Sequence, residues 1–258
     1  MPALLEDPAS HNPPPQAHIQ AANTLTPRHT TLPKSDSAAV TLYPITNGPS
    51  SIPQDLVKYL HAEFSAEIER GTTYPMEKAL GLQQFAEYWF GTFAVVAILD
   101  DEGDAAADGL REGRDWAKVC LGTFYIKPNY PGRCSHICNA GFITTNVARG
   151  KGVGFAMGET YLEFAPKLVR IAQLHPEVSC TSASMCITAV HMIMDNVNVA
   201  VQGYKYSVFN LVFANNPASI RIWERLGFSV IGRVPKAGRL DNSEELVDAL
   251  IFGRELGN

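Results

Sequence analysis

The sequence predicts an α+β domain in which helices flank a mixed sheet. Apolar runs typical of strands alternate along the chain with segments whose apolar residues recur at helical spacing. The expected order is strand, two helices, three strands, helix, strand, helix and two strands. This order combines hairpins with crossovers, which requires both antiparallel and parallel strand pairs. With 258 residues, 46% of them hydrophobic, the chain can build a substantial core.

Composition and charge exclude several classes of protein. A formal net charge of −5 argues against a dedicated nucleic-acid-binding protein, which carries a basic patch. The best apolar run, residues 93–99, is much shorter than the roughly 18 uncharged residues of a membrane span. Residues 1–8 lack the pattern of a secretory signal, and the five cysteines have no framework spacing. We expect a soluble cytoplasmic protein without nucleic-acid or membrane partners.

The first 37 residues differ in composition from the rest. They hold seven of the 17 prolines and few large apolar residues. Such a stretch cannot bury enough surface to offset its ordering entropy, so we expect a disordered tail over 1–37. Arg28 is its only arginine, which does not favour a mitochondrial presequence. The folded domain is expected over 38–258.

The first half of that domain has five predicted elements. Residues 39–45 read as a strand, and a helix is expected from Pro53, a favourable first helical residue, to Gly71. A second helix is expected over 77–90. Two apolar strands follow, joined by an acidic loop at 100–115, and they cover residues 93–99 and 118–126.

The second half begins with a strand at 137–144, which runs into a glycine-rich turn and a helix ending near residue 165. A strand over 204–213 precedes a helix that Asn216-Pro217 opens and Gly227 closes. The last two strands are expected at 228–234 and 245–252.

The glycine-rich turn is the first segment that suggests chemistry. Gly150, Gly152 and Gly154 remove side chains, so that successive backbone N–H groups can face an anion at a helix N-terminus. The spacing is not that of a dinucleotide-binding loop, and Lys151 is followed by Gly152 rather than by the serine or threonine of an ATP loop. Taken alone, the segment also fits a turn that merely uses glycine.

Two segments together resemble one superfamily. Arg149-x-x-Gly152-x-Gly154 resembles the acetyl-CoA pyrophosphate loop of the Gcn5-related N-acetyltransferases. The segment Asn216-Pro217-Ala218-Ser219-Ile220-Arg221-Ile222-Trp223-Glu224-Arg225-Leu226-Gly227-Phe228 resembles their Asn-x-x-small-x-x-x-aromatic-x-x-x-Gly-Phe helix. The resemblance implies the Gcn5-related fold, a mixed central sheet with splayed middle strands flanked by helices, and acetyl-CoA as co-substrate.

Longer blocks look like the fungal L-azetidine-2-carboxylate N-acetyltransferases. They lie at 121–130, 133–142, 203–213 and 247–253 within a resemblance that covers most of 53–168 and 203–255. It implies a homodimeric enzyme that acetylates small cyclic imino acids such as azetidine-2-carboxylate and pyrroline-5-carboxylate or its open semialdehyde. It further implies a role in proline metabolism and oxidative-stress tolerance, in the cytoplasm and also in mitochondria.

The resemblance assigns site residues one by one. Asn139 and Asn210 are expected to be catalytic and to recognise substrate, with the backbone N–H of Leu211 beside them. Amide groups can hold a carboxylate without adding a charge, although a single strand asparagine is equally typical of a satisfied buried amide. The co-substrate is expected to contact Phe142, Ile143, Thr144, Arg149, Gly150, Lys151, Gly152, Val153, Gly154, Asn216 and Trp223.

Three of these expectations have a chemical basis. Backbone N–H groups over 142–144 would stabilise the thioester oxyanion. Asn216 would contact the pantetheine arm or the substrate, and it also suits a helix N-cap. Trp223 stands where the superfamily usually has a tyrosine, and an indole N–H is not a useful acid. We therefore expect direct attack by the deprotonated amine, with water handling the protons.

No metal is expected. Cys134-x-His136-x-Cys138 would share one face of a strand, but this spacing matches no standard zinc site. The looser set His175, Cys180, Cys186 and His191 is weaker still.

Residues 169–202 interrupt the resemblance. Without these 34 residues, Ala165-Pro166-Lys167-Leu168 would run directly into Gly203-Tyr204, as the family pattern does. One hypothesis is a retained intron, because valine codons begin GT, a glutamine codon can be CAG, and 34 codons keep the frame. A lid or a dimer insertion is the alternative.

Two other functions stay open at this stage. One is acetylation of another small amine, and the second is non-catalytic acyl-CoA binding, which Trp223 and the 169–202 segment favour. A protein-lysine acetyltransferase is less favoured, because the matched blocks point to an enclosed pocket for a small acid.

Overall fold

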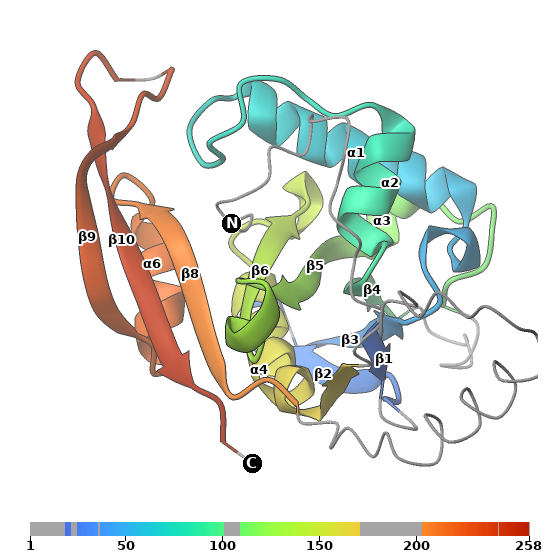
Figure 1. Ribbon diagram of the computed structural model, residues 1–258. Coiled ribbons are helices and arrows are strands. Elements are labelled where there is room, and N and C mark those ends of the chain that lie inside the picture. The colour runs from blue at the N-terminus through green and yellow to red at the C-terminus, as the bar shows by residue number, and fades with distance from the viewer. Residues whose placement is uncertain are drawn as a thin grey trace, which may run out of the picture.

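The computed structural model describes residues 19–21, 25–35, 37–100, 109–170, 203–241 and 243–257. Its centre is an eight-stranded sheet in the order β2-β3-β4-β5-β6-β8-β10-β9 (Figure 1). The strands are β2 (Arg28–Leu32), β3 (Ala38–Ile45), β4 (Phe93–Leu99), β5 (Cys120–Pro128), β6 (Ile137–Thr144), β8 (Tyr206–Phe213), β9 (Ser229–Gly238) and β10 (Val247–Glu255). A separate pair joins β1 (Ile19–Ala21) and β7 (Leu168–Arg170).

Helices cover both faces of the sheet. They are α1 (Gln54–Glu69), α2 (Leu82–Phe90), α3 (Trp116–Val119), α4 (Val153–Phe164) and α6 (Pro217–Arg225). Short 3-10 turns lie at η1 (Pro49–Ser51), η3 (Gly132–Cys134), η4 (Asn146–Ala148) and η5 (Ala165–Lys167). The predicted α+β class with a mixed sheet is confirmed. No helix in the described ranges is long and apolar enough to cross a bilayer.

The sheet separates two cores. One contains α1, α2 and α3, and the stripe predicted from helical spacing is buried there: Leu56, Leu60, Phe64 and Ile68. Phe85 and Trp89 of α2 pack beside Phe64, with ring centroids 5.4 and 5.2 Å away. The other core contains α4 and α6 and includes Met157, Tyr161 and Trp223.

The sheet parts between β6 and β8. Among the described strands this is the one parallel neighbour pair of the sheet, and it is in register only at Ile137↔Tyr206 and Cys138↔Ser207. Beyond this point the strands diverge, as the resemblance implied (Figure 1). A buried polar chain links them where they still pair, because the Tyr161 hydroxyl from α4 meets both Cys138 Sγ, at 3.0 Å, and Ser207 Oγ.

The N-terminal boundary of the folded domain differs from the expectation. Residues 28–32, placed in the disordered tail, form β2, which pairs with β3 in the register Arg28↔Leu42 to Leu32↔Ala38. Leu32 is buried, and the Arg28 guanidinium donates to Thr160 Oγ1 on α4 at 2.7 Å. Prolines on either side, Pro27 and Pro33, concealed this short strand. The other expectations for residues 1–18 and 22–24 lie outside the described residues.

Helix α2 begins later than predicted. It starts at Leu82 rather than near residue 77, because Gly81 has extended backbone angles and forms the N-cap. The Gln84 side chain accepts a hydrogen bond from the Gly81 N–H at 3.2 Å, which fixes the first turn.

The hypotheses on the 169–202 segment fall largely outside the described residues, which stop at Arg170 and resume at Gly203. Its two flanks meet: the Tyr204 N–H donates to the Ala165 carbonyl at 3.2 Å. A Cβ on Gly203 would lie 1.6 Å from the Pro166 oxygen, so only glycine permits this approach. The domain therefore closes across the ends of the segment.

Candidate functional site

A cleft of about 440 Å³ lies where β6 and β8 diverge. One wall is the end of β6, the other is the end of β8, and the start of α6 and the residues after α1 complete it. Of the predicted site residues, those that line it are Phe142, Ile143, Thr144, Arg149, Gly154, Leu211, Asn216 and Trp223. The cleft therefore brings together segments that lie far apart in the sequence.

The exposed edge of β6 supplies a backbone donor to this cleft. The Phe142 carbonyl accepts a hydrogen bond from the Tyr74 hydroxyl at 3.0 Å, so this carbonyl faces away from β5. In an antiparallel strand the N–H and C=O of one residue point to the same side. The Phe142 N–H therefore faces the gap. Burial raises the pKa of Tyr74, which keeps its hydroxyl protonated as a donor.

The glycine-rich turn has the backbone that an anion site needs. Gly150 and Gly152 have φ of 78° and 91°, a left-handed conformation that other residues rarely adopt. Gly152 is the N-cap of the 12-residue α4, whose first N–H groups have no intrahelical acceptor. A Cβ on Gly154 would lie 3.1 Å from Ile222 of α6, so glycine here lets the two helices approach. These residues fit a pyrophosphate held at the helix N-terminus.

Arg149 is held by an acidic residue that the sequence analysis missed. Its Nη2 lies 2.7 Å from Glu67 Oε2 on α1, and both residues line the cleft. The Thr73 hydroxyl donates to the other Glu67 oxygen at 2.7 Å. Burial raises the pKa of Glu67, but the hydrogen bonds from Thr73 and Arg149 and the charges of Arg70 and Arg149 outweigh it. The pKa therefore lies below its usual value.

Asn139 and Asn210 lie beside the cleft rather than in its lining, and a third asparagine joins them. Asn129 Oδ1 accepts from the side-chain amides of Asn139, at 3.0 Å, and Asn210, at 2.6 Å. Asn129 also donates to Asn210 Oδ1 at 3.1 Å. All three are at most 3% exposed, and Asn139 Oδ1 has no hydrogen-bond partner. An unpartnered buried acceptor is costly, which favours a ligand donor at this oxygen.

Asn129 could have been found from its spacing. It lies two residues after Lys127, which is the register partner of Asn139. Strand alternation therefore places the side chains of Asn129 and Asn139 on the same face of the sheet as Lys127. The Asn129 N–H donates to the Ile137 carbonyl at 2.8 Å, which continues the ladder beyond β5.

The helix that opens at Asn216 forms the far wall of the cleft. Asn216 Oδ1 accepts from the Ser219 N–H at 3.1 Å, so its predicted N-cap role is confirmed. The Trp223 indole N–H donates to Ser219 Oγ at 2.9 Å, one helical turn back. The centroid of the Trp223 ring system lies 4.4 Å from the ring centroid of Phe209 on β8. Its donor is thus already engaged within α6.

The residues of Cys134-x-His136-x-Cys138 do not share one strand face, because only Cys138 lies on a strand. Cys134 is exposed in η3, whereas Cys138 is buried in β6, because the turn at Pro131 delays the strand to Ile137. Burial raises the pKa of Cys138 to about 12. Within the part of the chain that the structure describes, no group of three His, Cys, Asp or Glu side chains could hold a metal.

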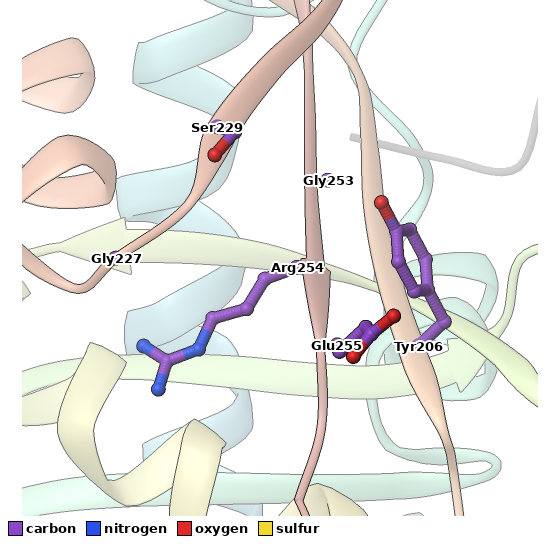
Figure 2. Close-up of a pocket in the computed structure, with 6 residues that line it drawn as sticks. All are labelled: Tyr206, Gly227, Ser229, Gly253, Arg254 and Glu255. Atoms are coloured by element: carbon purple, nitrogen blue, oxygen red, sulfur yellow. The ribbon is translucent and has the colours of Figure 1, made fainter.

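A second hollow of about 400 Å³ lies along β8 and β10 and contains no predicted site residue. Figure 2 shows Arg254 pointing to one side of β10, while Tyr206 and Glu255 lie together on the other. The Arg254 guanidinium lies 5.9 Å from the centroid of the Phe228 ring, just after the end of α6. This favours a structural role for Arg254 at the helix C-terminus.

The cleft, the left-handed glycine turn and the splayed strands define an acetyl-CoA-dependent acyltransferase fold. The chain is 37% identical over 200 residues to N-acetyltransferase aca1 of Schizosaccharomyces pombe, covering 77% of this chain and 79% of that protein. It therefore belongs to the Gcn5-related N-acetyltransferases. Protein SPT10 of Saccharomyces cerevisiae is 29% identical over 88% of this chain, which spans only 35% of SPT10. No family model matches the chain.

Solved structures agree on the fold. A Gcn5-related N-acetyltransferase from Kribbella flavida has a TM-score of 0.55 and 22% identity, covering 84% of this chain and 98% of that one. A phosphinothricin acetyltransferase of the same superfamily from Sinorhizobium meliloti, in complex with acetyl-CoA, has a TM-score of 0.52 and 16% identity. It covers 84% of this chain and 89% of its own. Together with the relative from Schizosaccharomyces pombe, these structures identify the chain as an N-acetyltransferase of this fold.

Proposed function

We propose that this enzyme acetylates the nitrogen of small cyclic imino acids of the azetidine-2-carboxylate type, and of pyrroline-5-carboxylate in its open semialdehyde form, which has a free amine. The observation that carries the proposal is the buried amide cluster of Asn129, Asn139 and Asn210. A small zwitterion needs donors for its carboxylate and an acceptor for its N–H. Neutral amides supply both without adding a charge that shifts the pKa of the amine.

The chain's own groups support direct attack by a deprotonated amine. Co-substrate supplies an acetyl thioester, and the Phe142 N–H, which faces the gap, can stabilise the negative charge that develops on the thioester oxygen. Asn139 and Asn210 orient the acceptor, with the Leu211 backbone N–H beside Asn210. The C–N bond forms as the C–S bond breaks, the nitrogen loses its proton to water, and CoA leaves as a thiolate. Because the Trp223 N–H is engaged with Ser219, water rather than an aromatic acid protonates this thiolate. Rate then comes mainly from positioning.

The closest competing function is acetylation of another small amine. Thiol release from acetyl-CoA separates the two, measured with L-azetidine-2-carboxylate, L-proline, an open-chain amino acid and a lysine peptide. We expect turnover with the four-membered ring and little with the lysine peptide. Faster turnover of the open-chain acid would overturn the substrate assignment. Binding of acetyl-CoA without turnover of any acceptor would favour the non-catalytic acyl-CoA-binding function.

We also propose a homodimer, in the cytoplasm or mitochondria, with a role in proline-linked oxidative-stress tolerance. The dimer is supported by β9, which among the described strands pairs with β10 alone and exposes Val230, Ile231 and Val234. Sedimentation of the intact chain tests it, and a monomer at micromolar concentration would contradict it.

The 169–202 segment is proposed to be dispensable for the fold, and the contact between Tyr204 and Ala165 supports this. Thiol release should therefore survive in a chain that lacks residues 169–202. Turnover by the shorter chain alone would support the retained-intron hypothesis, and an abundant transcript that encodes all 34 residues would contradict it.

A further inference from the structure

Helix α1 holds the anion loop at two points. Glu63 Oε2 accepts a hydrogen bond from the Asn146 N–H at 3.1 Å, at the start of η4. One helical turn later, Glu67 Oε2 lies 2.7 Å from Arg149 Nη2, at the end of η4. Residues four apart share a helix face, so one side of α1 contacts both ends of the segment from Asn146 to Arg149 that leads into the glycine turn.

Within the pair of Glu67 and Arg149, Glu67 is the constrained partner. Its side chain is 14% exposed, against 49% for Arg149. The Thr73 hydroxyl and the Arg70 guanidinium also donate to it, so its carboxylate is fixed before Arg149 is added. The guanidinium carries five N–H donors, and the contact with Glu67 leaves donors on Nη1 and Nε for another anion.

We infer that Glu67 is a positioning residue for acetyl-CoA binding: it orients Arg149 so that the guanidinium's remaining N–H groups face the pyrophosphate at the N-terminus of α4. A long surface arginine otherwise loses rotamer freedom when it binds an anion, and Glu67 removes part of that cost in advance. The opposite role, in which Glu67 competes with the pyrophosphate for Arg149, predicts an effect of opposite sign.

The test is the dissociation constant of acetyl-CoA, measured by calorimetry without acceptor. Glu67→Gln should weaken binding about five- to tenfold, since couplings of contacting pairs are typically of this size. The matched control is Glu69→Gln, an exposed residue of the same helix, which should bind as the native chain does. In an Arg149→Gln background, Glu67→Gln should add nothing further.

A truncated acetyl donor distinguishes a loss of Arg149 positioning from a general structural defect. S-acetylpantetheine lacks the pyrophosphate, so its dissociation constant should be the same for the native chain and Glu67→Gln. Unchanged or tighter acetyl-CoA binding by Glu67→Gln would overturn the inference, and so would equal weakening of both donors. Since no acceptor is present, either result leaves the proposed substrate class untouched.

The pH dependence has a definite sign. The pKa of Glu67 is lowered in the folded protein, so its carboxylate stays ionised as pH falls to its usual titration range. The ratio of the two dissociation constants, Glu67→Gln to native, should therefore be constant from about pH 6 to pH 8. It should decline only in more acidic solution, as Glu67 is protonated.

Discussion

The gap between β6 and β8 has two ends that are built differently. At the closed end, next to the point where Cys138 and Ser207 still pair, the buried amides of Asn129, Asn139 and Asn210 hydrogen-bond one another. At the open end, the Phe142 N–H and the turn at Gly152 present backbone instead. One divergence of two strands thus creates a side-chain site and a backbone site next to each other.

Because the two ends are built differently, the acetyl-CoA site and the acceptor site depend on different features of the chain. A backbone site depends on conformation, which glycine and helix geometry fix. A buried amide cluster depends on which side chains stand at Asn129, Asn139 and Asn210. We expect changes at the closed end to affect the acceptor and changes at the open end to affect acetyl-CoA.

The largest effect is expected from Asn129→Leu at the closed end. It removes the oxygen to which the side-chain amides of Asn139 and Asn210 both donate, so these buried N–H groups lose their acceptor. We expect kcat/KM for the acceptor to fall about 100-fold, as for a misplaced reacting group. Unfolding free energy should fall by about 2–4 kcal/mol.

Two further variants serve as controls for that result. Asn129→Asp keeps an oxygen for both amides and should recover part of the acceptor kcat/KM. Asn47→Leu, at an exposed asparagine near α1, should leave both activity and stability unchanged. If Asn129→Leu instead weakens acetyl-CoA binding as much as acceptor binding, the two ends are not separate.

A smaller effect is expected from Gly152→Ala at the open end. The space around its Cβ is free, with the nearest atom 4.0 Å away, so the cost is that of the left-handed backbone. About 1–2 kcal/mol of backbone strain corresponds to a dissociation constant for acetyl-CoA that is roughly tenfold higher. Gly257→Ala, in open space without positive φ, is the control. An unchanged dissociation constant would show that this turn does not bind acetyl-CoA.

The smallest effect is expected from Trp223→Tyr, which tests whether an aromatic acid is missing. Because the indole N–H is bonded to Ser219, Trp223 is a packing residue, and kcat should change by no more than about twofold. A pH–rate profile checks this directly. A large gain in kcat with a new basic pKa would mean that the native enzyme lacks a general acid that this site can use.

The sequence predicted most of the fold for identifiable reasons. The α1 stripe, the turn at Gly152 and the cap at Asn216 are local patterns, and each element lies within a few residues of its predicted position. The short β2 was missed because its pairing with β3 is a tertiary contact. α2 was started too early because the Gly81 cap was overlooked.

The site was predicted more fully at the open end than at the closed end. Glycine spacing suggested a backbone anion site and the resemblance assigned residues 149–154 to the co-substrate. The left-handed backbone at Gly150 and Gly152 fits that prediction. Glu67, Tyr74 and Asn129 were missed because they act through contacts between segments distant in the sequence. Trp223 was expected to contact the co-substrate, and the structure places it in the cleft lining with its indole N–H bonded to Ser219.

Two-substrate kinetics of thiol release can show whether the two ends of the gap bind different substrates. The acceptor is L-azetidine-2-carboxylate, and KM is determined for both substrates in the native chain, Asn129→Leu and Gly152→Ala. The account predicts a crossed pattern, in which Asn129→Leu raises only the KM of the acceptor and Gly152→Ala only that of acetyl-CoA. If each variant raised both KM values to the same extent, the division of the gap into an acceptor end and a donor end would be contradicted.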